Sequence, residues 1–440
     1  MEMKEVEKYL KYKDTKVPWL GEIPEHWEVT KGKWLYIKEE RIAKKQDGII
    51  TCFRDGQVTL RSKRKTDGFT IALKEHGYQG IKKGDLVIHN MDAFAGAIGV
   101  SDSDGKSTPV YSVCTHRLAF KVNSYYYAYF LRSLAKNGLI ESLAKGIRER
   151  STDFRFNDFG RLFLSVPPLL EQNNIVTFLD RKTTLIDQAI AIKQKQIELL
   201  KERRQILIHK AVTRGLDPNV KMKDNGVEWI GEIPEGWEVK RFKELCKAFG
   251  RIGFRGYTTS DLVDEGEGAI TISPSNIKEE FMVFEKCTYL NWHKYNESPE
   301  IQIQENDVLI VKTGSTYGKI GIVKKLPQEA TINPQLLVLK DIKINPDYFY
   351  SVLKSHIIQT QVEREVIGST IPTISETKIM SFKIAIPKNL AEINEIVNFT
   401  NDINLKFSMA ISLKEQEIEK LKEYKSTLIN SAVTGKIKVL

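Results

Sequence analysis

The sequence predicts an α+β fold: two pseudo-twofold-related α+β domains joined and separated by a long antiparallel coiled coil of two helices. Two observations carry this prediction. One unit of about half the chain is written twice, and each copy ends in a long stretch that contains neither glycine nor proline. Together they divide the 440 residues into four parts, which are residues 1–166, 167–218, 219–386 and 387–440.

The duplication is clearest near the start of each copy. A Trp-x-Gly-Glu-Ile-Pro-x-x-Trp motif begins at Trp19 and again at Trp229, and residues 85–100 align with residues 307–322. The offset is 210 at the first match and 222 at the second, so the second copy carries extra residues. Internal duplication predicts pseudo-twofold symmetry, which suits a partner that is itself nearly twofold, as duplex DNA is.

Composition excludes several classes of protein. A hydrophobic content of 41% and a charged content of 28% are typical of a globular chain with two or three domains. No apolar run approaches the ~20 residues that a membrane span needs. The charged N-terminus lacks the apolar core of a signal peptide. The four cysteines show no CxxC spacing, which indicates reduced thiols and a cytoplasmic protein.

The chain is basic, with a formal charge of +10 and a pI of about 9.1. Positive charge attracts a phosphate backbone but does not determine which sequence is read. The charge therefore favours a polyanionic partner only weakly.

The two glycine-free and proline-free stretches predict long helices. The first, residues 171–213, follows Pro167-Pro168 and stops before Gly215; the second covers residues 392–434. Alternating steps of four and three define a heptad seam in each, with six of eight positions apolar. The alternative is two unrelated amphipathic helices. The predicted seam residues are Ile186, Ile190, Ile197, Leu200, Leu207, Phe407, Ile411, Ile418, Leu421 and Leu428.

The linker predicts how the helices run. About 15 residues separate the end of the first helix from Trp229, so the second domain must begin near that end. Its own helix then has to lead away again. A parallel pair would need a long return connection, so the antiparallel arrangement is favoured.

This layout resembles the specificity subunit of type I restriction-modification systems. The resemblance rests on the repeated Trp-x-Gly-Glu-Ile-Pro-x-x-Trp motif, the Gly-x-Ile-Gly turns at Gly96 and Gly318, and the long helices after Pro167 and Pro387. It covers essentially the whole chain. In that family each globular part is a target recognition domain that reads one half of a split DNA site.

The resemblance also implies partners. The helices of such subunits act as spacers and dock two methyltransferase subunits, and a restriction subunit joins that core. S-adenosylmethionine and ATP are then expected in the partners, with no cofactor in this chain. The residues agree with a non-catalytic subunit, because no methyltransferase Pro-Pro-Tyr/Phe loop, Walker lysine spacing or zinc-ligand spacing is present.

Direct readout of DNA needs Arg or Lys for guanine and Asn or Gln for adenine. In the first domain a dense basic loop suits phosphate contact, with base reading or a solvated loop as alternatives. His89 and Asn90 precede the Gly-x-Ile-Gly turn. Three arginines, Arg148, Arg150 and Arg155, lie before the first long helix. The candidates are Arg61, Lys63, Arg64, Lys65, His89, Asn90, Arg148, Arg150 and Arg155.

In the second domain, a string that alternates arginine with glycine and aromatic residues is predicted to contact DNA, with a structural strand-and-turn role as the alternative. The loop before Gly318 occupies the place of the first domain's His89–Asn90 loop; a plain hairpin is the alternative there. The candidates are Arg251, Arg255, Tyr257, Lys312, Thr313, Ser315 and Tyr317. Four tryptophans, Trp19, Trp27, Trp229 and Trp237, are predicted core anchors rather than base-stacking residues.

These observations predict a sequence-specific duplex DNA-binding subunit of a type I restriction-modification enzyme. Two alternatives stay open. One is a stand-alone DNA-binding or coiled-coil scaffold protein. The other is the recognition chain of a split system that is not type I.

Overall fold

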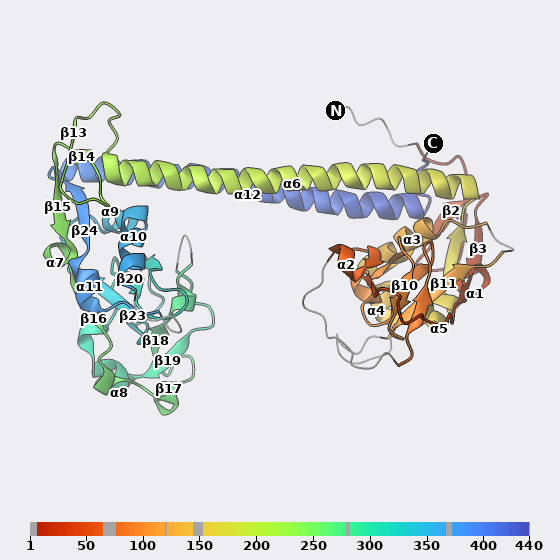
Figure 1. The fold of residues 1–440 in the computed structure, drawn as a ribbon, viewed down its shortest axis with the longest axis horizontal. Coiled ribbons are helices and arrows are strands. Elements are labelled where there is room, and N and C mark those ends of the chain that lie inside the picture. The colour runs from red at the N-terminus through yellow and green to blue at the C-terminus, as the bar shows by residue number, and fades with distance from the viewer. Residues whose placement is uncertain are drawn as a thin grey trace. The chain divides into compact units, whose positions relative to one another are not determined.

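The computed structural model describes residues 7–64, 76–118, 121–143, 153–278, 282–366 and 372–439 (Figure 1). The chain forms two compact units. The first consists of Met1–Gln194 and Lys414–Leu440, and the second of Lys195–Leu413. Each unit therefore contains one globular part and one portion of both long helices.

The first unit is built on an antiparallel sheet of strand order β4-β11-β8-β9. Its central strand β8 is an apolar run, Leu86-Val87-Ile88, that is fully buried. Helix α3 packs on this sheet through buried aromatic and leucine side chains. The elements are β1 (Tyr12–Asp14), β2 (Glu22–Pro24), β3 (Glu28–Lys31), α1 (Gly32–Leu35), β4 (Tyr36–Lys38), β5 (Ile50–Cys52), β6 (Val58–Leu60), α2 (Arg61–Arg64), β7 (Gln79–Ile81), β8 (Leu86–His89), η1 (Ala93–Ala95), β9 (Ile98–Val100), β10 (Gly105–Ser107), β11 (Tyr111–His116), α3 (Ser124–Lys136), α4 (Leu139–Leu143), α5 (Phe156–Arg161) and β12 (Phe163–Val166).

The second unit repeats this frame with strand order β16-β23-β20-β21. It adds a second sheet, β17-β19-β18-β22, that encloses a separate apolar cluster. The elements are β13 (Met222–Lys223), β14 (Ile233–Pro234), β15 (Trp237–Arg241), α7 (Phe242–Leu245), β16 (Lys247–Gly250), β17 (Leu262–Val263), β18 (Gly268–Ile272), β19 (Thr288–Asn291), α8 (Trp292–Asn296), β20 (Val308–Val311), β21 (Ile320–Ile322), β22 (Ala330–Ile332), β23 (Leu336–Lys340), α9 (Pro346–Leu353), α10 (His356–Glu365), α11 (Glu376–Ser381) and β24 (Lys383–Pro387).

In both units a tryptophan anchors the body to the start of a long helix. The indole of Trp27 donates to Glu171 at 2.9 Å, and the indole of Trp237 donates to Glu392 at 2.8 Å. Both indoles are buried, whereas Trp19 and Trp229 are half-buried. Glu171 also accepts hydrogen bonds from the Tyr9 hydroxyl and the His26 ring. The four tryptophans therefore pack into the two bodies rather than standing free for base stacking.

The long helices are α6 (Leu169–Arg214, 46 residues) and α12 (Leu390–Val433, 44 residues). Neither helix contains glycine or proline to interrupt it, and α6 begins directly after Pro168. Each ends at a glycine with positive φ, +77° at Gly215 and +74° at Gly435. Only glycine adopts this conformation without strain, so it terminates a helix readily.

The two helices run antiparallel, as predicted. In the first unit Asp187 of α6 pairs with Lys425 of α12 at 2.7 Å, and Lys193 pairs with Glu417 at 2.5 Å. The partner's number falls as the α6 number rises, which defines antiparallel helices. The α+β fold with an antiparallel helix pair is thus confirmed.

The heptad seam lies between the helices in both units. Among the ten predicted seam residues, half are buried and the others are half-buried. The buried ones are Ile186, Ile197, Ile411, Ile418 and Leu428, and the half-buried ones are Ile190, Leu200, Leu207, Phe407 and Leu421.

Candidate nucleic-acid interface

Equivalent turns join β8 to β9 in the first unit and β20 to β21 in the second. Gly96 and Gly318 take positive φ values of +94° and +75° there, so each turn needs its glycine. The same backbone hydrogen bond braces both turns. The N–H of Phe154 donates to Asn90 O at 3.0 Å, and the N–H of Ile374 donates to Lys312 O at 2.9 Å. The duplicated frame therefore presents the same kind of turn twice.

In the first unit the two predicted residues at this turn face inward. The Asn90 amide oxygen accepts from the Ser112 hydroxyl at 2.8 Å, and the side chain is buried. The His89 ring packs edge-on against Tyr111 and accepts from the N–H of Asp92. Burial lowers the pKa of His89, although nearby Asp92 opposes this shift. Both side chains therefore shape the turn, and the exposed side chain at its tip is Met91.

The basic loop forms the short helix α2, whose cations have local partners. The Arg64 guanidinium binds both oxygens of Asp55, at 2.9 and 2.7 Å, and lies over the Phe53 ring. Burial alone would raise the pKa of Asp55, but Arg64 and the backbone hold this pKa below its ordinary value. The Lys63 ammonium donates to Ser103 at 2.6 Å. These contacts fix α2 on the body of the unit.

The remaining candidates of the first unit differ in position. Arg61 is half-buried and donates to Thr51 at 3.3 Å. Arg155 extends from the segment that braces the turn, with its side chain 70% exposed, and pairs with Asp153 at 2.6 Å. Lys65, Arg148 and Arg150 lie outside the described residues.

Sequence reasoning missed Arg54. Its guanidinium pairs with Asp92 at 2.8 Å while its side chain is 67% exposed. This contact ties the segment before β6 to the β8–β9 turn, so Arg54 stands beside the turn. Nothing in its sequence context marked it, because an isolated arginine carries no motif.

In the second unit the β20–β21 turn is polar. Ser315 is exposed, whereas Lys312, Thr313 and Tyr317 are half-buried. Thr313 forms a bridge with Thr373, and the Thr373 hydroxyl donates to its side chain at 3.4 Å. The ring of Tyr317 packs against the core of the unit. The segment around Thr373 therefore lies alongside this turn, as the segment around Arg155 does in the first unit.

Arg251 is the candidate whose position differs most from the prediction. It is 6% exposed, and its guanidinium donates to Ile332 O at 3.1 Å and to the Thr331 hydroxyl at 3.0 Å. The ring of Tyr257 lies 5.2 Å from the guanidinium carbon. These contacts hold the guanidinium inside the body, as the strand-and-turn alternative requires, and contact of Arg251 with DNA stays a prediction. Arg255 lies nearer the surface, 38% exposed and paired with Glu300 at 3.2 Å.

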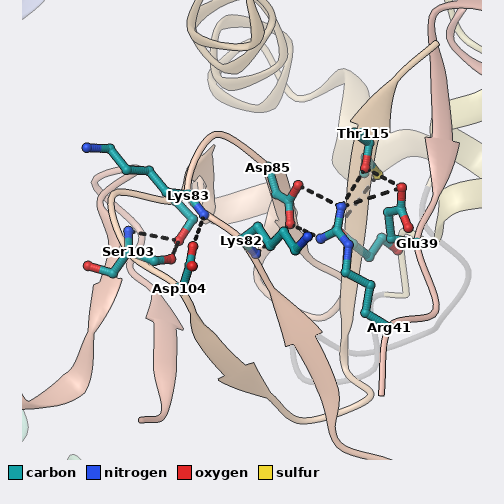
Figure 2. A network of polar contacts seen from close by, with 11 residues as sticks. Glu39, Arg41, Lys82, Lys83, Asp85, Ser103, Asp104 and Thr115 are labelled. Carbon is teal, nitrogen blue, oxygen red and sulfur yellow. Dashed lines mark hydrogen bonds and ion pairs between the residues drawn. The ribbon is translucent and has the colours of Figure 1, made fainter. Parts of the chain in front are cut away.

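A polar network that the sequence did not reveal holds the other end of β8 (Figure 2). Arg41 binds the carboxylate of Asp85 and donates to Thr115 at 3.0 Å, and Thr115 donates to Glu39 at 2.6 Å. Asp85 also accepts from the N–H of Lys82 at 2.7 Å. In the second unit the corresponding carboxylate, Asp307, accepts from a backbone N–H in the same way. The network is structural: it sets where the strand begins.

Two features are absent from the described part of the chain. No group of three His, Cys, Asp or Glu side chains there is arranged to hold a metal ion. Nor does any helix in these residues combine the length and apolar character that crossing a membrane requires.

The fold and these turns define a class: an α+β protein duplicated along an antiparallel helix pair, with equivalent polar or basic turns in both copies. Comparison with known proteins identifies the class further. A family model described as the type I restriction modification DNA specificity domain matches residues 234–423.

Two relatives and two solved structures are similar to the chain. The putative type I restriction enzyme MjaX specificity subunit of Methanocaldococcus jannaschii is 26% identical over 96% of both chains. The MjaVIII specificity subunit of the same organism is 25% identical over 69% of this chain and 68% of the relative.

A solved structure concerned with assembly of the type I R-M system shares the fold, with a TM-score of 0.69, 14% identity and coverage of 93% and 98%. The HsdS subunit from Thermoanaerobacter tengcongensis gives a TM-score of 0.50, 16% identity and coverage of 94% and 98%. The chain is thus similar to specificity subunits of type I restriction-modification systems, and its residues 234–423 match the model of their DNA specificity domain.

Proposed function

We propose that the chain reads duplex DNA in two separate half-sites, one with each unit, as the non-catalytic specificity subunit of a type I restriction-modification enzyme. The observation that carries this proposal is the pair of equivalent turns, β8–β9 and β20–β21, on the same strand frame. Equivalent turns on a duplicated frame are suited to meet the same kind of partner twice.

The parts beside the turns differ between the units, which supports an asymmetric target. The first unit carries the β5–β6 hairpin and α2 with its arginines and lysine, whereas the second carries the sheet β17-β19-β18-β22. Base edges are read by side chains that differ between targets, while phosphate contacts fix orientation. Two different readers on one frame therefore imply two different half-sites.

We assign phosphate contacts to the exposed cations near the turns. In the first unit these are Lys63 and Arg155, together with Arg54, which the structure adds to the candidates. Lys65, Arg148 and Arg150 remain candidates on sequence grounds. In the second unit we assign DNA contacts to Arg255, which is 38% exposed, to the exposed Ser315 and to the half-buried Lys312.

The outer faces of the long helices support docking of two methyltransferase subunits. Leu185, Ile192, Leu199 and Ile206 recur every seven residues along α6 and are each more than half exposed. On α12 Leu405, Met409 and Leu413 are exposed to a similar degree. A second apolar stripe opposite a filled seam is what a helix needs to pack against further helices.

Catalysis then belongs to the partners. S-adenosylmethionine would bind the methyltransferase subunits and the ATP that drives the reaction would bind the restriction subunit, so neither reaction would take place on this chain. Its own contribution is to select the sequence and to position the base that a partner modifies.

A reconstitution experiment tests the proposal. The purified chain is mixed with the methyltransferase of its own system and S-adenosylmethionine, and methyl transfer to DNA is measured. Each component alone should be inactive, and the mixture should methylate a two-part site. Methyl transfer by the chain alone would refute a non-catalytic role, and DNA binding without any methyltransferase association would favour a stand-alone binding protein.

A further inference from the structure

The second unit contains a cavity that the proposed DNA reading does not use. Its volume is about 960 Å³, and it lies between α6, the β20–β21 turn, α9, the start of α10 and α12. Among the described residues that line it there is no Asp or Glu; residues 279–281, which follow Lys278 in the sequence, lie outside the described part. Its charged and imidazole groups are Arg204, His209, Lys278, Lys319, Lys354 and His356.

The equivalent corner of the first unit is closed by polar contacts. The Ser133 hydroxyl donates to the Asn430 amide oxygen at 2.9 Å. Lys425 pairs with Asp187 at 2.7 Å, and Tyr129 packs against the core and donates to Asp180 at 2.6 Å. The Lys425 ammonium is therefore neutralised by a carboxylate in this copy.

The second unit carries different residues at the same places. With the offsets of 221 and 222 that relate the copies, Ser408 replaces Asp187, Ser351 replaces Tyr129 and Arg204 replaces Lys425. Compared with the first unit, this corner lacks the carboxylate and the aromatic ring but still contains a cation, Arg204. Ser355 and His209 stand where Ser133 and Asn430 bond to each other, yet the buried Ser355 Oγ and His209 Nδ1 atoms have no hydrogen-bond partner.

The charge around these two atoms is positive. Burial lowers the pKa of His209, and His356 and Arg214 lower it further. Two tyrosines, Tyr317 and Tyr350, also line the cavity. Buried polar atoms without partners are uncommon in folded proteins and often mark a place where another group binds.

We propose that this cavity binds a phosphate-bearing ligand of nucleotide size. Its volume lies within the range of roughly 300–1,000 Å³ that small-molecule sites occupy. Arginine and lysine bind phosphate oxygens, and tyrosine faces stack on nucleobases. Ser355 and His209 supply the remaining hydrogen-bonding atoms. The ligand is either a free nucleotide or a nucleotide within a DNA strand, because both offer the same phosphate and base.

The test is titration calorimetry on the full chain with AMP, ATP, inorganic phosphate and a single-stranded oligonucleotide. The main variant is Ser408→Asp, which restores the first unit's carboxylate opposite Arg204 and should fold because that ion pair exists in the other copy. The control is Ser412→Asp, which adds the same charge one turn further along α12, at an exposed position outside the cavity lining. Thermal unfolding of each variant checks that it is folded.

We expect AMP or ATP to bind saturably. Ser408→Asp should weaken this binding at least tenfold, whereas Ser412→Asp should change it less than twofold. If only the oligonucleotide binds with this pattern, the phosphate comes from a DNA strand and the proposal still holds. Ser351→Tyr, which refills the space, should weaken binding in the same way. Absence of binding by every probe, or equal effects of Ser408→Asp and Ser412→Asp, would overturn it.

Discussion

Lengthening both long helices by seven residues should move the two half-sites apart without changing either of them. Seven residues preserve the heptad seam, and at ~1.5 Å per residue they add about 10 Å to the helix pair. At ~3.4 Å per base pair this corresponds to roughly three more base pairs between the half-sites. The insertions belong after Leu200 in α6 and after Ala410 in α12.

The ion pairs between the helices determine those insertion points. The numbers of Lys193 and Glu417 add to 610, and those of Asp187 and Lys425 add to 612. Residues whose numbers add to about 611 therefore lie level across the pair. Inserting at the same level in both helices keeps each existing pair intact. Insertions at different levels would separate the paired residues that lie between the two insertion points.

The assay is selection of methylated sites from a DNA library with randomised half-site spacing, using the complex reconstituted with methyltransferase. The double insertion should prefer a spacer about three base pairs longer. An insertion in α6 alone, which shifts the seam out of register, should lose activity. A double-insertion variant that methylates DNA at the original spacing would show that the helices do not set the separation.

Four other predictions concern individual side chains. Glu171→Ala should destabilise the first unit about 2 kcal/mol more than Glu392→Ala destabilises the second. Glu171 accepts from three side chains and Glu392 from Trp237, and each donor left unpaired costs ~1–3 kcal/mol. Equal shifts of the calorimetric transitions in the two variants would contradict this. Burial would raise the pKa of Glu171, but the three donors hold it below its ordinary 4.5. The stabilisation by Glu171 should therefore be present at neutral pH and be lost as the pH falls through the folded-state pKa. An effect of Glu171→Ala that does not change with pH would contradict this prediction. Replacing Lys63 and Arg155 by Gln should weaken binding to all DNA sequences alike and reduce the salt slope by about one for each phosphate that is no longer neutralised; a weakening confined to one sequence would instead indicate base reading. Leu199→Glu should reduce methyltransferase association at least tenfold in a pull-down titration, and unchanged association would exclude that face of α6 as the docking surface.

The sequence predicted the elements that depend on local signals. Heptad spacing and the absence of helix breakers between Pro168 and Gly215 were enough to predict α6, and the short linker predicted its antiparallel partner. The repeated motifs predicted the repeated frame, in which Trp27 and Trp237 occupy equivalent buried places. These features could be predicted because periodicity, chain breakers and repetition are all visible along the chain.

The candidate site was harder to predict because a sequence shows charge but not partners. Arg251 stood among glycines and aromatic residues, yet its guanidinium binds the backbone of Ile332, far away in the chain. Asn90 was predicted to face DNA but bonds to Ser112 across the sheet. Arg54, without a motif, stands beside the turn through Asp92. Only folding brings such partners together.

Mapping of the methylated sequence tests the central claim most directly. Sequencing of methylated bases in DNA treated with the reconstituted complex should give two different short half-sites separated by a fixed gap of unspecified bases. Substituting Arg255, in the second unit, should alter at most one of the two half-sites. A single uninterrupted motif, or a change in both half-sites after that one substitution, would contradict the claim that each unit reads its own half.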